Sequence, residues 1–180
     1  MNFCTRCGSG LEFRVPEGDD RQRHVCPACG HIHYINPRLV VGCIVEWKNK
    51  VLLCQRAIEP MYGMWTAPAG FLEAGETAAD GAKRETHEEA KAAVEIIAPY
   101  TLFNLTFINQ IYLMFRARLI DGRFDVGTES LAVRLFAEDE VPWDEIAFTA
   151  IRRTLGHYFE DRKTGDFRFR MGDLSPERPA

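Results

Sequence analysis

Residues 70–92 read GFLEAGETAADGAKRETHEEAKA, and the interpretation of the whole chain starts from this stretch. Glu85, Glu88 and Glu89 stand at positions i, i+3 and i+4, so on a helix their carboxylates project from one face. Three like charges on one face destabilise a helix unless a cation lies between them. Carboxylate oxygens with no Cys or His nearby suit Mg²⁺ or Mn²⁺. The stretch therefore predicts a divalent metal site, with a solvated acidic helix face as the alternative.

A helix through this stretch is indicated independently of the glutamates. Thr77 followed three residues later by Asp80 is the Ser/Thr-x-x-Asp/Glu pattern of a helix start. Ala82, Thr86 and Ala90 then recur on the side away from the glutamates. Such small residues allow a helix to lie tightly against a sheet.

The complete spacing resembles the Nudix box, Gly-x5-Glu-x7-Arg-Glu-aliphatic-x-Glu-Glu-x-Gly-aliphatic. Six fixed positions of that pattern match here: Gly70, Glu76, Arg84, Glu85, Glu88 and Glu89. Three positions differ, because Thr86 replaces an aliphatic residue, Lys91 replaces the late glycine, and Ala92 is a small last aliphatic residue. Lys91 puts the left-handed or close-packed exit of the helix in doubt. No carboxylate of the pattern is lost.

The resemblance implies a role for each matched residue. Glu85, Glu88 and Glu89 would be inner metal ligands, and Glu76 an outer ligand or orienting partner. The carbonyl of Ala69 would join them, and Arg84 would hold the carboxylates in an ion-pair clamp. Family members place the general base in the box or on a later loop, and Glu129 in GTESLAVRLF is the loop candidate. A surface glutamate in a turn is the alternative for Glu129.

Nudix proteins hydrolyse nucleoside diphosphates linked to another moiety, and the resemblance implies this reaction here. A zinc ribbon before the box is similar to the NADH pyrophosphatases, but their SQPWPFPxS signature has no counterpart in this sequence. The segments YINPRLVVGCIVEW, GMWTAPAGFLEAGE and ESLAVRLFA resemble more closely the ADP-ribose and FAD pyrophosphatases of the plant plastid type. That branch implies AMP plus ribose 5-phosphate or FMN as products.

Candidate substrate contacts come from the positively charged and aromatic residues around the box. They are Arg56, Tyr62, Phe71 and Phe103, with Tyr34, Phe107 and Tyr112 as further rings for stacking on adenine or flavin. Aromatic residues at such spacing are more often part of a core. NADH hydrolysis and RNA decapping, which use the same pyrophosphate chemistry, stay open as alternatives.

Two cysteine pairs near the N-terminus predict a second metal site. Cys4-x-x-Cys7 and Cys26-x-x-Cys29 have the spacing of a four-cysteine zinc ribbon. A closed site of four thiolates has no open coordination position, so this zinc is expected to be structural. Two disulfides are the alternative. His24, His31 and His33 flank the second pair and are expected to be surface histidines.

Composition limits the class of protein. The chain has 180 residues, is 46% hydrophobic and 27% charged, and carries a net charge of -4. This fits one domain with a small appendage, and the acidic balance disfavours a dedicated nucleic-acid-binding surface. A non-enzymatic zinc-ribbon module that binds nucleic acid is the alternative from another class. Without a signal peptide or a long apolar span, we expect a cytoplasmic protein with a small-molecule partner and no membrane contact.

The pattern along the chain predicts an α/β (α+β) fold. LVVGCIVEW and VLLCQRA read as a hairpin, AVEIIAPYTLF, NQIYLMFRARL and LAVRLFA as further strands, and 144–162 as an amphipathic helix. With the box helix these elements give a mixed sheet between two helices, the α/β/α sandwich that the resemblance implies. We expect a zinc ribbon over 1–35, a hydrolase domain over 36–163, and a loose tail over 164–180 with one short edge strand at DFRFRM.

A homodimer is also expected. Related ADP-ribose hydrolases complete one subunit's pocket with the other subunit. NQIYLMFRARL and LVVGCIVEW are more apolar than a sheet covered by two helices needs, and exposed apolar edges are usually paired or covered. Covering by the zinc ribbon is the alternative.

Overall fold

A computed structural model describes residues 1–176. The chain divides into two compact units, with the boundary between Asn36 and Pro37. The first unit is a three-stranded antiparallel sheet of β1 (Glu12–Arg14), β2 (Arg23–Val25) and β3 (Ile32–His33). Its buried residues are few, and two of the five are cysteines: Cys4, Pro16, Val25, Cys26 and His33. His33 is therefore not the surface histidine expected from the sequence. So little apolar burial cannot hold such a short segment together alone.

The second unit is built on one mixed sheet with the order β10-β5-β4-β9-β8-β11. These strands are β4 (Arg38–Trp47), β5 (Lys50–Arg56), β8 (Val94–Leu105), β9 (Gln110–Leu119), β10 (Ser130–Phe136) and β11 (Arg170–Asp173). Two short strands, β6 (Trp65–Thr66) and β7 (Ala69–Phe71), pair with β5 and β4. The pairs β4·β9 and β8·β11 are parallel, and the other pairs are antiparallel.

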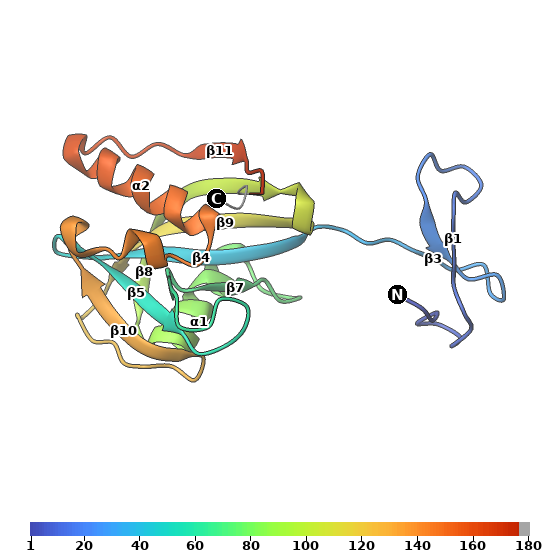
Figure 1. Cartoon of the computed structure of the whole chain (residues 1–180), viewed down its shortest axis with the longest axis horizontal. Helices are drawn as coiled ribbons and strands as arrows, with labels where there is room; N and C mark the ends of the chain where they lie inside the picture. The colour runs from blue at the N-terminus through green and yellow to red at the C-terminus, as the bar shows by residue number, and fades with distance from the viewer. Residues whose placement is uncertain (177–180) are drawn as a thin grey trace. The chain divides into compact units, whose positions relative to one another are not determined.

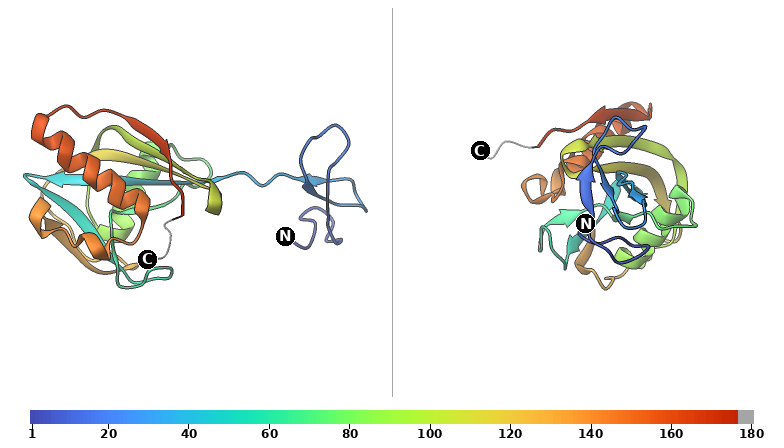
Figure 2. Two further views of the ribbon diagram at one scale, coloured as in Figure 1. Left: turned by 45° about the horizontal axis from the view of Figure 1, so that its top comes forward. Right: turned by 90° about the vertical axis from the view of Figure 1, so that its right-hand side faces the viewer.

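Alternation along the central strands separates two apolar cores. On β4, Val40 and Ile44 pack with α2 (Thr149–Thr164), whereas Val41, Cys43 and Val45 pack with α1 (Ala78–Ala90). Successive side chains of a strand point to opposite faces, so one continuous apolar run serves both helices. Figure 1 and the left view of Figure 2 show the sheet between α1, in green, and α2, in orange. The predicted three-layer sandwich is confirmed.

The position of β4 and β9 inside the sheet overturns one argument for a dimer. Both strands have neighbours on each side and a helix on each face, so their apolar excess is buried within one chain. They are not exposed edges in need of a partner. The sequence showed the excess but not the order of the strands that explains it.

The C-terminal part differs from its expected bounds. The helix α2 begins at Thr149 rather than Asp144, and a separate 3-10 helix covers Trp143–Glu145. A second 3-10 helix spans Glu138–Glu140, and a third, Thr106–Ile108, joins β8 to β9. No helix among residues 1–176 combines the length and apolarity needed to cross a membrane. The final residues of the expected tail, 177–180, lie outside the described part.

Candidate active site

The box helix carries its glutamates to the mouth of a cavity in the second unit. The Thr77 side chain accepts a hydrogen bond from the Asp80 amide at 3.1 Å, which confirms the predicted start of α1. Glu85, Glu88 and Glu89 line the same cavity. Glu88 is exposed, whereas Glu89 is 6% exposed, so the three carboxylates extend from solvent into the interior.

The carboxylate of Glu89 is the least satisfied polar group of the site. Its Oε2 is buried and has no hydrogen-bond partner. Burial, followed by the charge of Glu85, raises the pKa of Glu89 to about 8. A buried carboxylate without a partner is costly unless it binds a proton or a cation. Glu89 therefore fits a metal ligand better than a structural residue.

Arg84 organises the outer part of the acidic cluster. Its Nε and Nη2 donate to the two oxygens of Glu76 at 3.1 and 2.8 Å, and its Nη1 donates to Glu85 at 2.7 Å and to Glu88 at 3.0 Å. Hydrogen bonds from Arg84 hold the pKa of Glu76 down at about 2. Nη2 also donates to the carbonyl of Phe71 at 3.1 Å, so the clamp ties the helix to β7.

Glycine at position 70 is required by close approach. A Cβ built on Gly70 would lie 2.3 Å from Glu85 Oε2, a distance that atoms in contact do not reach. The backbone of β7 thus passes directly beside the Glu85 carboxylate. Ala69, the residue before Gly70, lines the same cavity as Glu89. This arrangement brings Ala69 to the acidic cluster, and the role of its carbonyl as a metal ligand stays a prediction.

The glutamates are not gathered around one point in this structure. Among residues 1–176, the four ribbon cysteines form the one group whose potential ligand atoms converge for a metal. The reason lies in Arg84, which holds Glu85 and Glu88 by its own guanidinium and partly neutralises them. The donor set nevertheless fits Mg²⁺ or Mn²⁺, because it consists of carboxylate oxygens and includes the unpartnered oxygen of Glu89.

The loop that carries Glu129 is attached to the C-terminal end of α1. The Gly127 amide and the Ser130 hydroxyl both donate to the Glu89 carbonyl, at 3.0 and 2.8 Å. A Cβ on Gly127 would lie 1.9 Å from the carbonyl oxygen of Glu88. Glu129 is exposed and lines the cavity. Burial is the main reason that the pKa of Glu85 and that of Glu89 are raised, and the charge of Glu129 adds a smaller contribution. The structure thus brings this candidate base to the acidic cluster.

The cavity has a volume of about 1330 Å³ and combines acidic, basic and apolar walls. Of the expected substrate contacts, Arg56 and Phe71 line it, as do Phe107 and Tyr112. Phe103 instead lies in the core, 6% exposed, and Tyr62 is exposed outside the lining. Tyr34 belongs to the first unit, where the Arg23 guanidinium lies 5.1 Å from its ring.

Two cation–π pairs contribute to the walls, and neither was anticipated. The Arg38 guanidinium lies 4.4 Å from the centre of the Phe71 ring, and that of Arg56 lies 5.0 Å from the centre of the Phe148 ring. The Arg56 Nε also donates to the Pro60 carbonyl at 2.9 Å. No sequence signal pointed to Arg38 or Phe148, because both lie far from the box in sequence.

The exit of α1 corrects a further expectation. Lys91 takes the left-handed conformation at φ +50°, and its amide donates to the His87 carbonyl at 2.8 Å. The left-handed exit is therefore kept without glycine. Packing around the end of the helix holds the lysine in a conformation that it disfavours in isolation.

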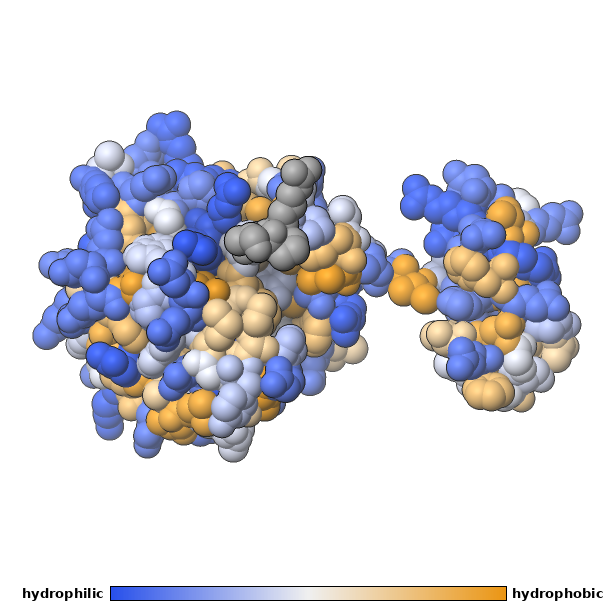
Figure 3. All heavy atoms as spheres, in the orientation of Figure 1, coloured by the Kyte–Doolittle hydropathy of each residue, from blue (hydrophilic) through white to orange (hydrophobic). Residues whose placement is uncertain are grey.

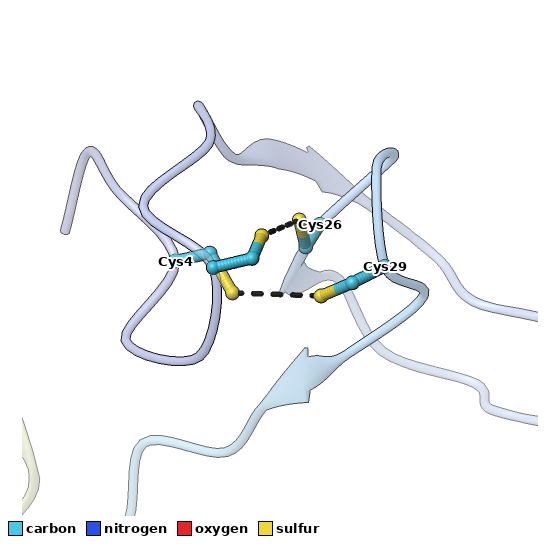
Figure 4. A group of neighbouring side chains, drawn as sticks. Cys4, Cys26 and Cys29 are labelled. Carbon is cyan, nitrogen blue, oxygen red and sulfur yellow. Dashed lines mark hydrogen bonds between the residues drawn. The ribbon is translucent and has the colours of Figure 1, made fainter.

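The four ribbon cysteines converge as predicted. Their potential ligand atoms all lie within 4.8 Å of one another, with 3.7 Å between the sulfurs of Cys4 and Cys29 and 3.4 Å between those of Cys7 and Cys26. A disulfide would place two sulfurs about 2.0 Å apart, whereas tetrahedral Zn–S bonds of about 2.3 Å separate them by nearly 4 Å. All six cysteines are free. Figure 4 shows the labelled sulfurs turned toward one another.

Comparison with known protein families identifies both units. A profile described as Nudix N-terminal matches residues 2–35, and a profile described as NUDIX domain matches residues 36–164. A crystal structure of a NUDIX hydrolase from Nitrosomonas europaea is 52% identical, with a TM-score of 0.95 over 98% of this chain and 100% of that chain.

Two curated relatives differ in their named substrates. An NAD-capped RNA hydrolase NudC of Vibrio parahaemolyticus is 31% identical over 89% of this chain and 62% of its own length. An ADP-ribose pyrophosphatase of Methanocaldococcus jannaschii is 41% identical over 31% of this chain and 33% of its own length. This chain thus spans less than two thirds of either relative. The relative that aligns over most of the chain gives no support to the expected preference for the ADP-ribose and FAD branch.

Proposed function

Because the chain belongs to the Nudix hydrolase family and carries that family's N-terminal zinc ribbon, we propose that it hydrolyses the pyrophosphate bond of AMP-containing dinucleotide-type compounds. Water adds to one phosphorus and the bond from that phosphorus to the bridging oxygen breaks. The products are AMP and the phosphorylated second half of the substrate, and two protons are released when both phosphates are dianions.

The observation that carries the proposal is the buried Oε2 of Glu89, which has no hydrogen-bond partner, in a residue that lines the cavity. Such a group binds either a proton or a cation, and the neighbouring box carboxylates favour a cation. Glu85, Glu88, Glu89 and the Ala69 carbonyl would hold Mg²⁺ or Mn²⁺. When bound, the ion neutralises the pyrophosphate and lowers the pKa of the attacking water.

The remaining residues act on position and charge. Arg84 holds Glu76, Glu85 and Glu88 in place through its hydrogen bonds. Arg56 is buried, lines the cavity and is suited to contact a substrate phosphate. Glu129 is our candidate for the group that accepts the proton of the attacking water, because its loop is tied to the Glu89 carbonyl.

The cavity of about 1330 Å³ is large enough for a dinucleotide, and its aromatic rings suit adenine or a second planar ring. ADP-ribose and FAD, which give AMP plus ribose 5-phosphate or FMN, are the candidates that the sequence motifs suggested. NAD(H) is the candidate favoured by the similarity to known proteins, because the relative that aligns over most of the chain is named for NAD-capped RNA. In that case NMN or its reduced form would replace FMN.

One panel of assays tests both the reaction and its substrate. The full chain is incubated with ADP-ribose, FAD, NADH and an NAD-capped RNA, each with Mg²⁺ and with Mn²⁺, and the products are separated by chromatography. We expect metal-dependent release of AMP and the highest kcat/KM on a free dinucleotide. Metal-dependent turnover of none of the four substrates would overturn the proposal.

Removal of the NAD cap from RNA is a second candidate function, favoured by the name of the Vibrio relative. It would give the highest kcat/KM on the capped RNA in the same panel. A third outcome, RNA binding that weakens steeply with salt and no turnover, would instead favour the nucleic-acid-binding module. The net charge of -4 disfavours that outcome.

A cytoplasmic homodimer stays a prediction from the sequence. Light scattering at micromolar concentration tests the assembly, and a dimer would have twice the 20.5 kDa mass of one chain. A mass of one chain that does not change on dilution or on addition of substrate would exclude it.

A further inference from the structure

Part of the cavity wall comes from beyond the segment that identifies the family. The NUDIX domain profile ends at residue 164, yet Leu174, Ser175 and Pro176 line the same cavity as the box glutamates. These three residues are called the C-terminal wall below. Ser175 and Pro176 are exposed, whereas Leu174 is 8% exposed and belongs to the core on the α2 face of the sheet.

The C-terminal wall is anchored by β11. This strand lies parallel to β8 and pairs Asp173 with Asn104 (Figure 1). The Leu174 amide donates to the Asn104 carbonyl at 2.9 Å, and Asn104 Nδ2 donates to Asp173 Oδ1 at 2.9 Å. Backbone and side-chain bonds to one residue of β8 therefore fix the chain directly before the cavity.

A second anchor holds the start of β11 against α2. Both Nη atoms of Arg170 donate to the carboxylate of Asp161, which also accepts a hydrogen bond from the Tyr100 hydroxyl at 2.9 Å. Asp161 is 6% exposed, so this ion pair is sheltered from solvent. Contacts with α2 and β8 therefore hold β11, the segment that leads into the C-terminal wall, in one position.

Apolar residues from other segments line the cavity together with the C-terminal wall. Leu105, which follows Asn104 on β8, is buried and lines the cavity together with Phe107, Ile108 and Phe148. Leu105 and Phe148 belong with Leu174 to the core on the α2 face, whereas Phe107 and Ile108 are exposed and α1 supplies the carboxylates. Figure 3 shows the visible face of the second unit, where weakly apolar residues gather near the centre with hydrophilic residues above and to the left.

A dinucleotide has a charged pyrophosphate between two ring-bearing halves, so a site for it needs an acidic, metal-binding side and an apolar side. We propose that the C-terminal wall determines substrate specificity by packing against the planar ring of the substrate half that lies away from the box glutamates. The inference rests on the proposed function, and it assigns recognition of the ring to residues outside the NUDIX domain profile. Leu174 supplies apolar contact, and Ser175 limits the space beside it.

Substitutions in the full chain test the inference by separating KM from kcat. Leu174→Ala removes the apolar contact, and Ser175→Trp fills the space in front of it. For the best substrate of the panel we expect KM to rise about tenfold in each variant while kcat stays within about twofold, because the chemistry at the glutamates is untouched. Leu174→Met, which conserves volume, should restore KM.

Met171→Ala is the matched control, because Met171 lies on β11, is 71% exposed and does not line the cavity. Thermal unfolding of each variant shows whether the fold is kept. Unchanged KM in both Leu174→Ala and Ser175→Trp overturns the inference. A rise in KM for Met171→Ala as large as that for Leu174→Ala does the same, since the effect then belongs to β11 and not to the wall.

Calorimetric titration with ADP-ribose and with FAD in Ca²⁺ separates this inference from the proposed function. If the chain hydrolyses no dinucleotide but binds one with an affinity that falls in Ser175→Trp, the function fails and the inference stands. If the chain hydrolyses a dinucleotide and the KM changes in neither variant, the proposed function stands and the inference fails. Absence of both turnover and binding overturns both.

Discussion

Glu89 is buried and its Oε2 has no hydrogen-bond partner, so its replacement gives the sharpest test of the metal site. Glu89→Gln keeps nearly the same volume and removes one charged ligand. We expect kcat at saturating Mg²⁺ to fall by about 10²-fold or more, with little change in fold. Glu95→Gln is the control, because Glu95 is exposed and only pairs with Arg118 on the surface. Full activity of Glu89→Gln would refute the metal assignment.

The same carboxylate makes stability depend on pH when Mg²⁺ and Mn²⁺ are absent. The pKa of Glu89 is raised to about 8 in the folded protein from its ordinary value of 4.5. The folded state thus binds the proton more tightly than the unfolded state, and this contribution is complete below pH 4.5 and lost as pH rises through about 8. Relative to Glu89→Gln, the original protein should lose on the order of 3 kcal/mol of unfolding free energy between pH 5 and 8. Urea denaturation at the two pH values measures this, and parallel pH profiles would contradict it.

Lys91 occupies a left-handed position where the family pattern has glycine. The left-handed conformation costs a residue with a Cβ about 1–2 kcal/mol, and glycine removes this cost. Part of the gain is offset, because glycine has more conformational freedom in the unfolded chain. Lys91→Gly should therefore stabilise the protein by about 0.5–1 kcal/mol and raise Tm by a few degrees. Lys91→Ala keeps the Cβ and should give no such gain. Equal Tm values for the two variants would show that the backbone is not strained at this position.

The elements with local signals were the predictable ones. Thr77 and Asp80 mark the start of α1 in a few residues, and the turn at Lys48–Lys50 joins two apolar runs into the hairpin of β4 and β5. The start of α2 was placed five residues early, because the amphipathic pattern continues through the 3-10 helix at Trp143–Glu145. The very short strands β6 and β7 have no pattern of their own and form only because β5 and β4 accept them.

The loop before β10 reaches the acidic cluster only because glycine stands at position 127. A Cβ there would lie 1.9 Å from the Glu88 carbonyl oxygen, so Gly127→Ala must move the loop or the helix end. We expect a loss of about 1–3 kcal/mol in stability and a fall in kcat as Glu129 is displaced. In Gly156→Ala, the control on α2, the added Cβ meets nothing within 4 Å. That helix substitution should stabilise slightly and leave kcat unchanged. Retained kcat in Gly127→Ala would remove Glu129 from the site.

For the whole molecule, sequence reasoning found the converging zinc cysteines and the candidate glutamate ligands, but only part of the cavity. The box and the cysteine pairs are short motifs whose chemistry is visible in the residue types. The walls made by Phe148 and Leu174 come from segments more than a hundred residues from Arg38, and only the fold brings them together. Because the sequence does not show the order of the strands, Phe103 was expected to contact the substrate. An aromatic residue on a strand gives the same sequence pattern whether its side chain faces a cavity or packs against a helix.

The two units should respond differently to loss of zinc. Residues 1–36 bury few side chains besides two cysteines, whereas the second unit has two apolar cores of its own. Structural zinc supplies on the order of 10 kcal/mol in comparable peptides, more than so small a core provides. Cys4→Ser combined with Cys7→Ser should therefore release zinc and abolish hydrogen-exchange protection in residues 1–36, while protection of α1 and the large sheet persists. Cys43→Ser replaces a buried thiol of β4 outside the ribbon, so this variant of the chain should keep the zinc. One zinc per chain in the double variant would mean that the metal is held elsewhere, and loss of protection in the sheet would mean that the units fold as one.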